Sequence, residues 1–464
     1  MAEKEDEIHS TAEDSPLLVD SSDLDEKETF RLAKYERYAY GLGHICNDVC
    51  AAMWFSYALI FYQIVIGFPP VYAGYLLFIG QTVDAMATPV VGTIIDRKGS
   101  RRAWHLFGSS MVCLSFPLIF NPRFATLWVQ FIYYAACITI FQISWALVQI
   151  SHLSLIPELT HVTEERAELT SIRYMSSVCS NITVYVFAWL FLHDSMGMRM
   201  DLIGPADSYK FQSLSFVVTF TGVIGTLLFH CFVHEKGTSA PISNPPSNNQ
   251  TLPRTESQYC CQSELYKVAT LYTASRLFLT ISMVYIPLYV NEAHVSDSGT
   301  LASVPLVSYI ASLGASLLMR HQKSVFTDNS FNYFVGTLAC IFGCLFVYFN
   351  PRSEETIVYI YIAAGLFGVG SAITTVVSLC ITANLVGPNT ERGAFVYSLV
   401  TFADKLLNGL AIVIIEFLKC DKMQMQMSEC AHYYRDVLAL VNGVLSVIGY
   451  LVLLTLPNML LVSS

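Results

Sequence analysis

Ionisable side chains lie inside otherwise apolar stretches of this sequence. Asp48 follows His44 by one helical turn, and Asn47 lies beside it. Asp84 is followed by Thr88 at the same spacing. A charged group in hydrocarbon costs at least about 2.5–3.5 kcal/mol, so each of these acids is a candidate for binding or moving a polar solute.

Basic residues in other apolar stretches balance these acids. Arg173 and Arg276 each lie in such a stretch, and Asp404, Lys405 and Asn408 lie together in another. The three acids and three bases sum to zero charge, and an unpaired buried ion is costly. The charges therefore either form permanent pairs between helices or face a water-filled cavity, and the sequence leaves both readings open.

The chain predicts membrane-spanning helices as the elements that position these groups. Only 13% of its residues are charged and 54% are apolar, whereas soluble proteins have about 25% charged residues. Apolar runs have the length of about 20 residues that a helix needs to cross a bilayer. Twelve runs are predicted: 38–62, 72–95, 103–121, 126–156, 168–193, 211–233, 264–290, 299–319, 331–349, 356–380, 394–417 and 432–457. The predicted fold class is all-α transmembrane.

The net charge of −10 comes almost entirely from one segment. Residues 1–29 hold eleven acids and two lysines, which gives 2 − 11 = −9. The remainder is close to neutral, which argues against a nucleic-acid partner. The acidic tail, taken as residues 1–37, is predicted to be disordered and does not have the basic start of a signal peptide.

The predicted helices form two halves. A polar segment at 234–263, rich in Pro, Ser and Asn, separates a six-helix bundle at 38–233 from a second at 264–457. Loops on the side of both termini hold twice as many Lys and Arg residues as the opposite loops. The positive-inside rule therefore places the tail, the linker and the short C-terminus at 458–464 in the cytoplasm.

The loop between the second and third predicted helices carries the most specific motif. It matches the G-x-x-x-D-R-x-G-x-R-R signature of major facilitator transporters at every defined position. The matching residues are Gly92, Asp96, Arg97, Gly99, Arg101 and Arg102. We expect Gly92 to allow close helix contact, Asp96 to lie at a helix N-terminus, and the arginines to pair across the seam between the halves. The alternative is a basic loop that only fixes topology.

The N-terminal tail contains an acidic dileucine pattern. Glu13 precedes Leu17 and Leu18 in a segment that is predicted to be exposed and cytoplasmic. Such patterns are bound by endolysosomal adaptor coats, so an adaptor coat is a predicted partner.

Cysteine spacing and sequence motifs indicate neither a metal site nor an enzyme. Cys420 and Cys430 lie in one predicted non-cytoplasmic loop and could form a disulfide. The other cysteines show no C-x-x-C spacing, so neither a metal site nor a cofactor is predicted. The sequence contains no phosphate-binding P-loop, G-x-S-x-G or H-E-x-x-H pattern, so an enzyme is not expected.

Several segments together resemble one known family, that of major facilitator superfamily domain-containing protein 12. The segments that carry the resemblance are 43–48, 80–84, 102–106, 149–159, 393–397, 404–405 and 408–409. The resemblance covers nearly the whole chain outside the tail and the linker. This family belongs to the melibiose-permease-like branch of sugar–cation symporters, so the resemblance implies the major facilitator fold.

The resemblance also implies a function. It implies a carrier in lysosomal or melanosomal membranes that imports cysteine from the cytosol. In the melibiose-permease-like branch, acids on helices one and four and an arginine on helix five hold the substrate, and Asp48 and Arg173 match two of these positions. Gln149 replaces the helix-four acid. A cation site of that branch uses two helix-two carboxylates, and here Asp84 is followed by Thr88. These departures count against sodium coupling and sugar binding.

Rival functions remain at this point. One is a proton- or cation-coupled symporter of carbohydrate or lysolipid, and another is a membrane scaffold or receptor that transports nothing. A scaffold has no need of ions in lipid, so the retained charges favour a carrier. A zwitterionic amino acid suits charges of both signs, and coupling to protons is a further expectation. The plasma membrane is the alternative location.

Overall fold

The computed structural model describes eleven stretches of the chain. They are residues 32–97, 100–122, 124–160, 163–192, 203–234, 263–293, 299–321, 328–350, 356–386, 390–419 and 432–461. The regular elements in these stretches are helical throughout, apart from one isolated bridge residue. This arrangement satisfies backbone hydrogen bonds within each helix, as a lipid environment requires.

The first half of the chain contains six long crossings. The first crossing is formed by α2 (Lys34–Leu42), α3 (Ile45–Ile60) and a π-helical turn, η1 (Phe61–Val65). The others are α4 (Pro70–Arg97), α5 (Arg101–Ile119), α6 (Leu127–Ser154), α8 (Thr163–Leu192) and α9 (Ser208–Phe232), with short helices α7 (Ile156–Leu159) and η2 (Pro205–Asp207) between them. The first helix begins at Lys34, so the last residues of the predicted tail are helical.

The second half repeats this plan. Five crossings are single helices: α11 (Ser263–Glu292), α12 (Thr300–His321), α13 (Asn329–Tyr348), α14 (Thr356–Val386) and α15 (Thr390–Leu418). The last crossing is formed by α16 (Tyr433–Asp436), the π-helical turn η3 (Val437–Val441) and α17 (Asn442–Leu454), and it is followed by α18 (Asn458–Leu461).

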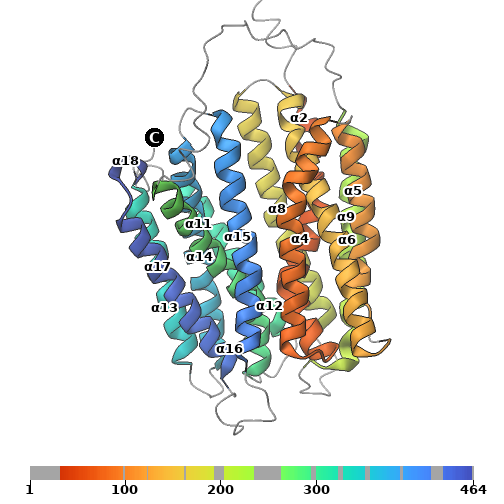
Figure 1. The fold of residues 1–464 in the computed structure, drawn as a ribbon, viewed down its shortest axis with the longest axis vertical. Coiled ribbons are helices and arrows are strands. Elements are labelled where there is room, and N and C mark those ends of the chain that lie inside the picture. Colours follow the sequence, from red (N-terminus) through yellow and green to blue (C-terminus); the bar gives the residue numbers. More distant parts are fainter. Residues whose placement is uncertain are drawn as a thin grey trace, which may run out of the picture.

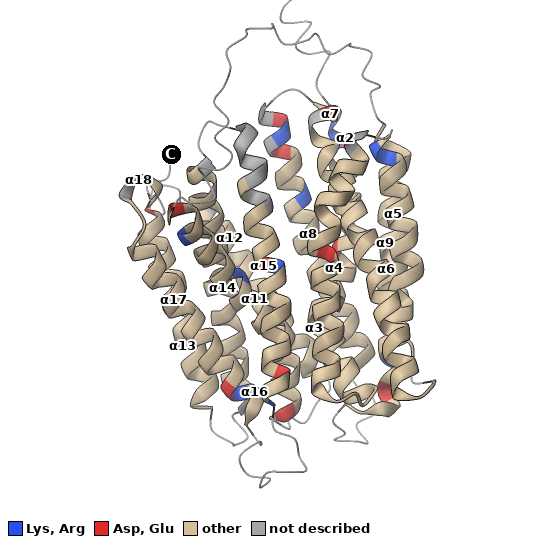
Figure 2. Cartoon of the chain, viewed as in Figure 1, with Lys and Arg blue, Asp and Glu red and all other residues tan. Residues whose placement is uncertain are grey.

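The helices have the length and composition of membrane spans. Within the described residues, ten of the crossings are both long and apolar enough to cross a bilayer. The remaining two crossings, α5 and α15, have 19 and 29 residues. Figure 2 shows charged residues mainly near the two ends of the bundle. The predicted all-α transmembrane fold is confirmed.

The two halves stand side by side with their helices roughly parallel (Figure 1). We call the end at which α2 begins and α17 ends the tail side, and the opposite end the far side. Among the described residues, the halves meet mainly through three helix pairs, α3 with α11, α4 with α15, and α8 with α12. Glycine allows close approach of one pair, because a Cβ added at Gly409 on α15 would lie 3.0 Å from atoms of Phe78 and Gln81 on α4.

Candidate functional site

A three-residue group joins α3 and α8 in the first half. His44 Nδ1 lies 2.9 Å from Asp48 Oδ1, one turn further along the chain. Arg173 Nη2 on α8 lies 3.1 Å from His44 Nε2. His44 and Asp48 are buried, and Arg173 is half-buried. The structure therefore brings together an acid and a base that the sequence places far apart.

A second pair crosses the seam between the halves. Asp84 lies near the middle of α4, and its Oδ2 is 2.7 Å from Lys405 Nζ on α15. Lys405 Nζ also donates to Thr88 Oγ1 at 3.2 Å, and Thr88 Oγ1 donates to the Asp84 carbonyl oxygen at 2.8 Å. The two halves are thus linked at mid-depth by opposite charges.

A third group lies in the second half. Arg276 Nε on α11 is 3.5 Å from Asp404 Oδ2 on α15, and Asn408 Nδ2 donates to Asp404 Oδ1 at 2.6 Å. Asp404 is buried, but the Arg276 side chain is 37% exposed. Most neighbours of Arg276 along α11 are buried, so this exposure marks an open space inside the protein.

Two predicted path residues lie to one side of these groups. Asn47 Nδ2 donates to the carbonyl oxygen of Trp145 at 3.1 Å, and Trp145 Nε1 donates to Gln149 Oε1 at 3.2 Å. Asn47 and Gln149 thus connect α3 to α6 through Trp145. In this conformation both side chains bind groups of the protein's own helices.

A fourth polar group, not predicted from the sequence, lies at the far side. Glu416 on α15 is fully buried, and its Oε2 accepts from Gln63 Nε2 of η1 at 2.6 Å. Tyr434 of α16 donates its hydroxyl to Gln63 Oε1 at 2.6 Å. Lys419 Nζ donates to the Tyr434 hydroxyl at 2.6 Å and to Gln63 Oε1 at 3.3 Å. We call these four residues the far-side seal, because they join the first half to the second.

A signal for this group was present in the sequence. Glu416 follows Lys405 by eleven residues, which is close to three turns of a helix with 3.6 residues per turn. The two side chains therefore lie on the same face of α15. This face packs on α4, since a Cβ added at Gly74 would lie 3.2 Å from Glu416 Cβ.

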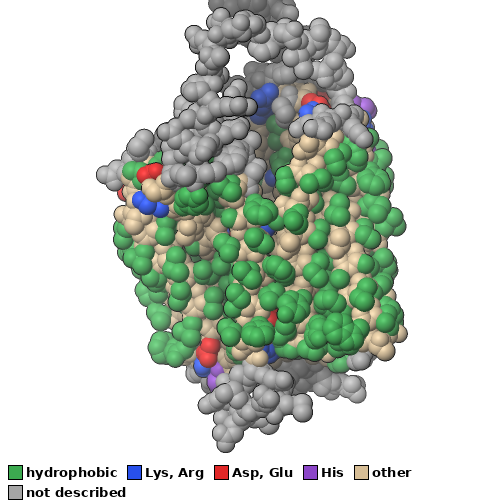
Figure 3. Space-filling view, viewed as in Figure 1, with side chains coloured by type: hydrophobic (Ala, Val, Ile, Leu, Met, Phe, Trp, Pro, Cys, Tyr) green, Lys and Arg blue, Asp and Glu red, His purple; other side chains and the backbone are tan. Residues whose placement is uncertain are grey.

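The space between the halves is open toward the tail side. At the far side, the seal is extended by Tyr57, whose hydroxyl lies 3.4 Å from the carbonyl oxygen of Leu301. Toward the tail side, the space-filling view shows cationic side chains between the two halves (Figure 3). Lys405 is 20% exposed although it lies near the middle of α15. We call this space the chamber.

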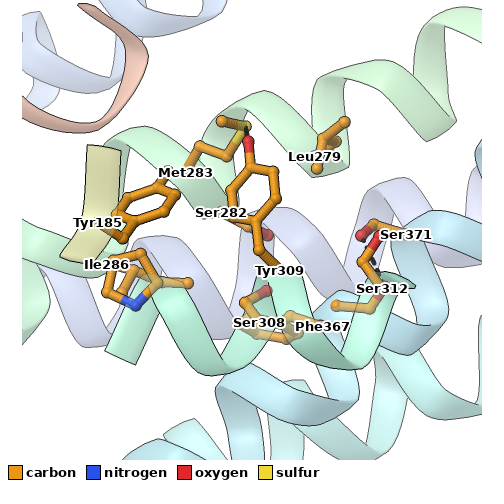
Figure 4. Close-up of a pocket in the computed structure, with 12 residues that line it drawn as sticks. Tyr185, Leu279, Ser282, Met283, Ile286, Ser308, Tyr309, Ser312, Phe367 and Ser371 are labelled. Carbon is orange, nitrogen blue, oxygen red and sulfur yellow. Dashed lines mark hydrogen bonds between the residues drawn. The ribbon is translucent and has the colours of Figure 1, made fainter. Parts of the chain in front are cut away.

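A small cavity beside the chamber is lined by serines and aromatic rings (Figure 4). Its volume is about 30 Å³. Tyr185 of the first half faces Tyr309, Ser308 and Ser312 of α12 and Ser371 of α14 across it. A cavity needs about 10–15 Å³ of such space to hold one water molecule, so this cavity holds about two.

The structure describes contacts of three residues of the major facilitator motif, Gly92, Arg101 and Arg102. A Cβ added at Gly92 would lie 4.0 Å from Ile150, an ordinary contact, so close helix approach does not require this glycine. Arg101 forms an ion pair with Glu158, and Arg102 Nη2 donates to the carbonyl oxygen of His230 at 2.6 Å. All of these partners belong to the first half, so these two contacts do not cross the seam.

Several predicted features lie outside the described residues. These are the side chains of Asp96 and Arg97, Gly99, the dileucine residues Glu13, Leu17 and Leu18, and the cysteines Cys420 and Cys430. Among the residues that are described, no group of three or more His, Cys, Asp or Glu side chains could hold a metal ion.

Comparison with known families decides the class of protein. The chain matches the MFS/sugar transport protein family over residues 39–462. It belongs to this family. Membership makes the chain a secondary transporter of the major facilitator superfamily and not an enzyme.

Individual MFS relatives agree with this assignment. The chain is 36% identical to major facilitator superfamily domain-containing protein 12 of Mus musculus over 444 residues, which cover 90% of this chain and 92% of the mouse protein. For the Homo sapiens protein of the same name, the identity is 36% over 454 residues, with 92% and 93% coverage. The crystal structure of a D-xylose–proton symporter has the same fold, with a TM-score of 0.67, 12% identity and coverage of 92% and 98%.

Proposed function

We propose that this MFS transporter imports cysteine from the cytosol into lysosomes or melanosomes by alternating access. The tail side is then the cytoplasmic side and the far side is the lumenal side. The described conformation is open to the cytosol. Relatedness to major facilitator superfamily domain-containing protein 12 supports the substrate and the location through the resemblance described above.

The observation that carries the proposal is the placement of charges of both signs on both walls of the chamber. The first half contributes Asp48 and Arg173, and the second half contributes Asp404 and Arg276. A free amino acid carries an ammonium and a carboxylate close together. Each end of it finds an opposite charge on the chamber wall, and such charge-assisted hydrogen bonds are about twice as strong as neutral ones.

A sugar suits this chamber less well. A sugar presents hydroxyl groups, which a carrier of this fold would bind mainly with uncharged polar side chains and acids. Here Gln149 occupies the helix-four position and already accepts from Trp145. The second candidate is a carrier of carbohydrate or lysolipid that is coupled to protons or cations. Competition for cysteine uptake distinguishes the two candidates.

Uptake by the purified protein tests the proposal. The protein is reconstituted into liposomes, and entry of radiolabelled L-cysteine is followed with and without unlabelled competitors. We expect saturable uptake that unlabelled cysteine blocks and that melibiose and lysophosphatidylcholine leave unchanged. Block by the sugar or the lysolipid would favour the second candidate. Absence of uptake for every solute would favour the scaffold or receptor.

The proposed location has a separate test in the tail. We expect Leu17→Ala combined with Leu18→Ala to move the protein from lysosomes to the cell surface, because an adaptor coat binds both leucines. Surface biotinylation and lysosomal staining measure the change. Val19→Ala is the matched control and should leave the location unchanged. Lysosomal staining of the double variant at the original level would contradict the sorting role.

A further inference from the structure

The hydrogens on His44 follow from the chemistry of its partners. An arginine side chain has only hydrogen-bond donors, so Arg173 Nη2 donates to His44 Nε2. Nε2 is then the bare nitrogen of a neutral ring, and Nδ1 carries the hydrogen. The Nδ1–H group donates to Asp48 Oδ1. His44 is therefore a neutral bridge that accepts from a cation and donates to an anion.

The surroundings of His44 hold its ring in place. The ring of His152 lies 5.4 Å from that of His44, and His152 Nε2 donates to the carbonyl oxygen of Tyr40 at 2.8 Å. His105 Nε2 donates to the carbonyl oxygen of Gly43 at 2.9 Å. His105 and His152 are fully buried. The bridge is thus packed against rings that are themselves fixed by backbone hydrogen bonds.

The two charged ends of the bridge each retain an unused polar atom. Among the described residues, Asp48 Oδ2 and Arg173 Nε are buried and have no hydrogen-bond partner. A buried polar atom without a partner costs about 1–3 kcal/mol, so it favours any ligand that can satisfy it. One atom accepts and belongs to an anion, and the other donates and belongs to a cation. The first can accept from the ammonium of an α-amino acid, and the second can donate to its carboxylate.

We propose that His44 is a positioning residue that keeps Arg173 and Asp48 apart, so that both stay available to the substrate. Arginine and carboxylate form strong two-pronged ion pairs when nothing separates them. A direct pair between Arg173 and Asp48 would use up the charges that an amino acid needs. His44 prevents it by satisfying one atom of each group. This role rests on the proposed function in that the substrate is an α-amino acid.

Substitutions of His44 show whether this residue acts as a hydrogen-bonding bridge or only fills space. Glutamine offers one amide donor and one amide acceptor, as the neutral imidazole does, whereas leucine offers neither. We expect His44→Leu to raise the KM for L-cysteine by about tenfold or more, with a smaller change in kcat, because the substrate must first break the new ion pair. We expect His44→Gln to keep the KM within about threefold of the wild-type value.

Two results would overturn the proposal. One is a KM in His44→Gln that rises as much as in His44→Leu, and the other is an unchanged KM in His44→Leu. His234→Leu is the control, because His234 is exposed at the end of α9, and it should leave both constants unchanged. Binding of L-cysteine to the detergent-solubilised variants measures the same loss without transport.

A structural measurement tests, without any substrate, whether His44 keeps Arg173 and Asp48 apart. The His44→Leu protein in lipid nanodiscs is imaged by electron cryo-microscopy without added amino acid. We expect a nitrogen of Arg173 within about 4 Å of an oxygen of Asp48, the usual limit of an ion pair. Side chains that remain apart would overturn the bridge. A wild-type protein that does not transport cysteine would overturn the proposed substrate alone.

Discussion

Replacement of Lys405 by methionine is expected to lower uptake by about 100-fold or more and to leave the abundance of the protein unchanged. Removing one partner of a buried ion pair costs about 3–5 kcal/mol, and each 1.4 kcal/mol corresponds to about a factor of ten. The Lys405 side chain is 20% exposed, so water reaches this site and relieves part of the cost, and the fold survives. The seam then loses the opposite charges that must separate and meet again in each cycle.

A double substitution distinguishes a permanent pair from a working one. Asp84→Asn combined with Lys405→Met removes both charges and leaves no unpaired ion. If the pair only holds α4 and α15 together, the double variant regains uptake. We expect it to regain thermal stability but to stay inactive, because the seam has no charge left to exchange. Uptake of radiolabelled L-cysteine measures activity. Size-exclusion profiles of the purified protein, recorded after heating, measure thermal stability.

A peripheral ion pair is the matched control for these variants. Lys210 Nζ and Asp207 Oδ1 lie 2.9 Å apart within the first half, at the far side, with 17% and 20% of their side chains exposed. Because this pair does not join the two halves, Lys210→Met should leave uptake within about twofold of the wild-type value. Wild-type uptake by Lys405→Met would exclude a role for the seam pair in transport.

Replacement of Gln63 by leucine is expected to shift the protein toward a conformation that is open at the far side. The substitution removes the donor to Glu416 and the acceptor of Tyr434 and Lys419. Hydrogen bonds to charged groups contribute about 1.5–3 kcal/mol each, so the ratio of the two conformations changes by about tenfold or more. Uptake falls because the carrier returns less often to the tail-side open state.

Distance measurements report this shift directly. Spin labels at Phe124 in the first half and Phe349 in the second half mark exposed far-side positions. Labels on non-natural amino acids avoid the 13 native cysteines. Double electron–electron resonance should show longer distances in Gln63→Leu than in the wild type.

Glu416→Gln is the conservative comparison, since its amide oxygen can still accept from Gln63. We expect its distances to lie close to those of the wild type. An unchanged distribution in Gln63→Leu would mean that the far-side seal does not hold the halves together.

The sequence predicts the helices well because length and apolarity are local properties. Each predicted run corresponds to a crossing, including α15, whose charges exclude it from a simple search for apolar helices. The cost of ions in hydrocarbon also identifies Asp84 and Lys405 as candidates, since their apolar neighbours are visible in the sequence alone. Their roles in substrate movement stay predictions.

The pairing of these residues could not be predicted from the sequence. Which charge meets which depends on the helices that become neighbours, and α4 meets α15 only because the two halves pack together. His44 illustrates the same limit. Its position one turn before Asp48 is visible in the sequence, but the contact with Arg173 comes from the packing of α8 against α3.

Two other features show where sequence patterns mislead. The motif arginines were expected to cross the seam, yet Arg101 finds Glu158 within the same half. Glu416 was overlooked because it lies near the end of its apolar run, where a charge is normally close to water. Burial of this end by α4 and η1 is a tertiary effect.

Gln63 lies in a stretch of helix that holds one residue more than a regular turn. In η1, the Ile66 amide donates to the Phe61 carbonyl oxygen, five residues earlier, at 2.9 Å. A π-helical turn of this kind can change to a regular α-helical turn, because only the hydrogen bonds of that turn rearrange. Such a change would swivel Gln63 by about 100°, the angle between successive residues of a helix. The extra residue in this turn therefore sets the angle at which Gln63 meets Glu416 of the second half.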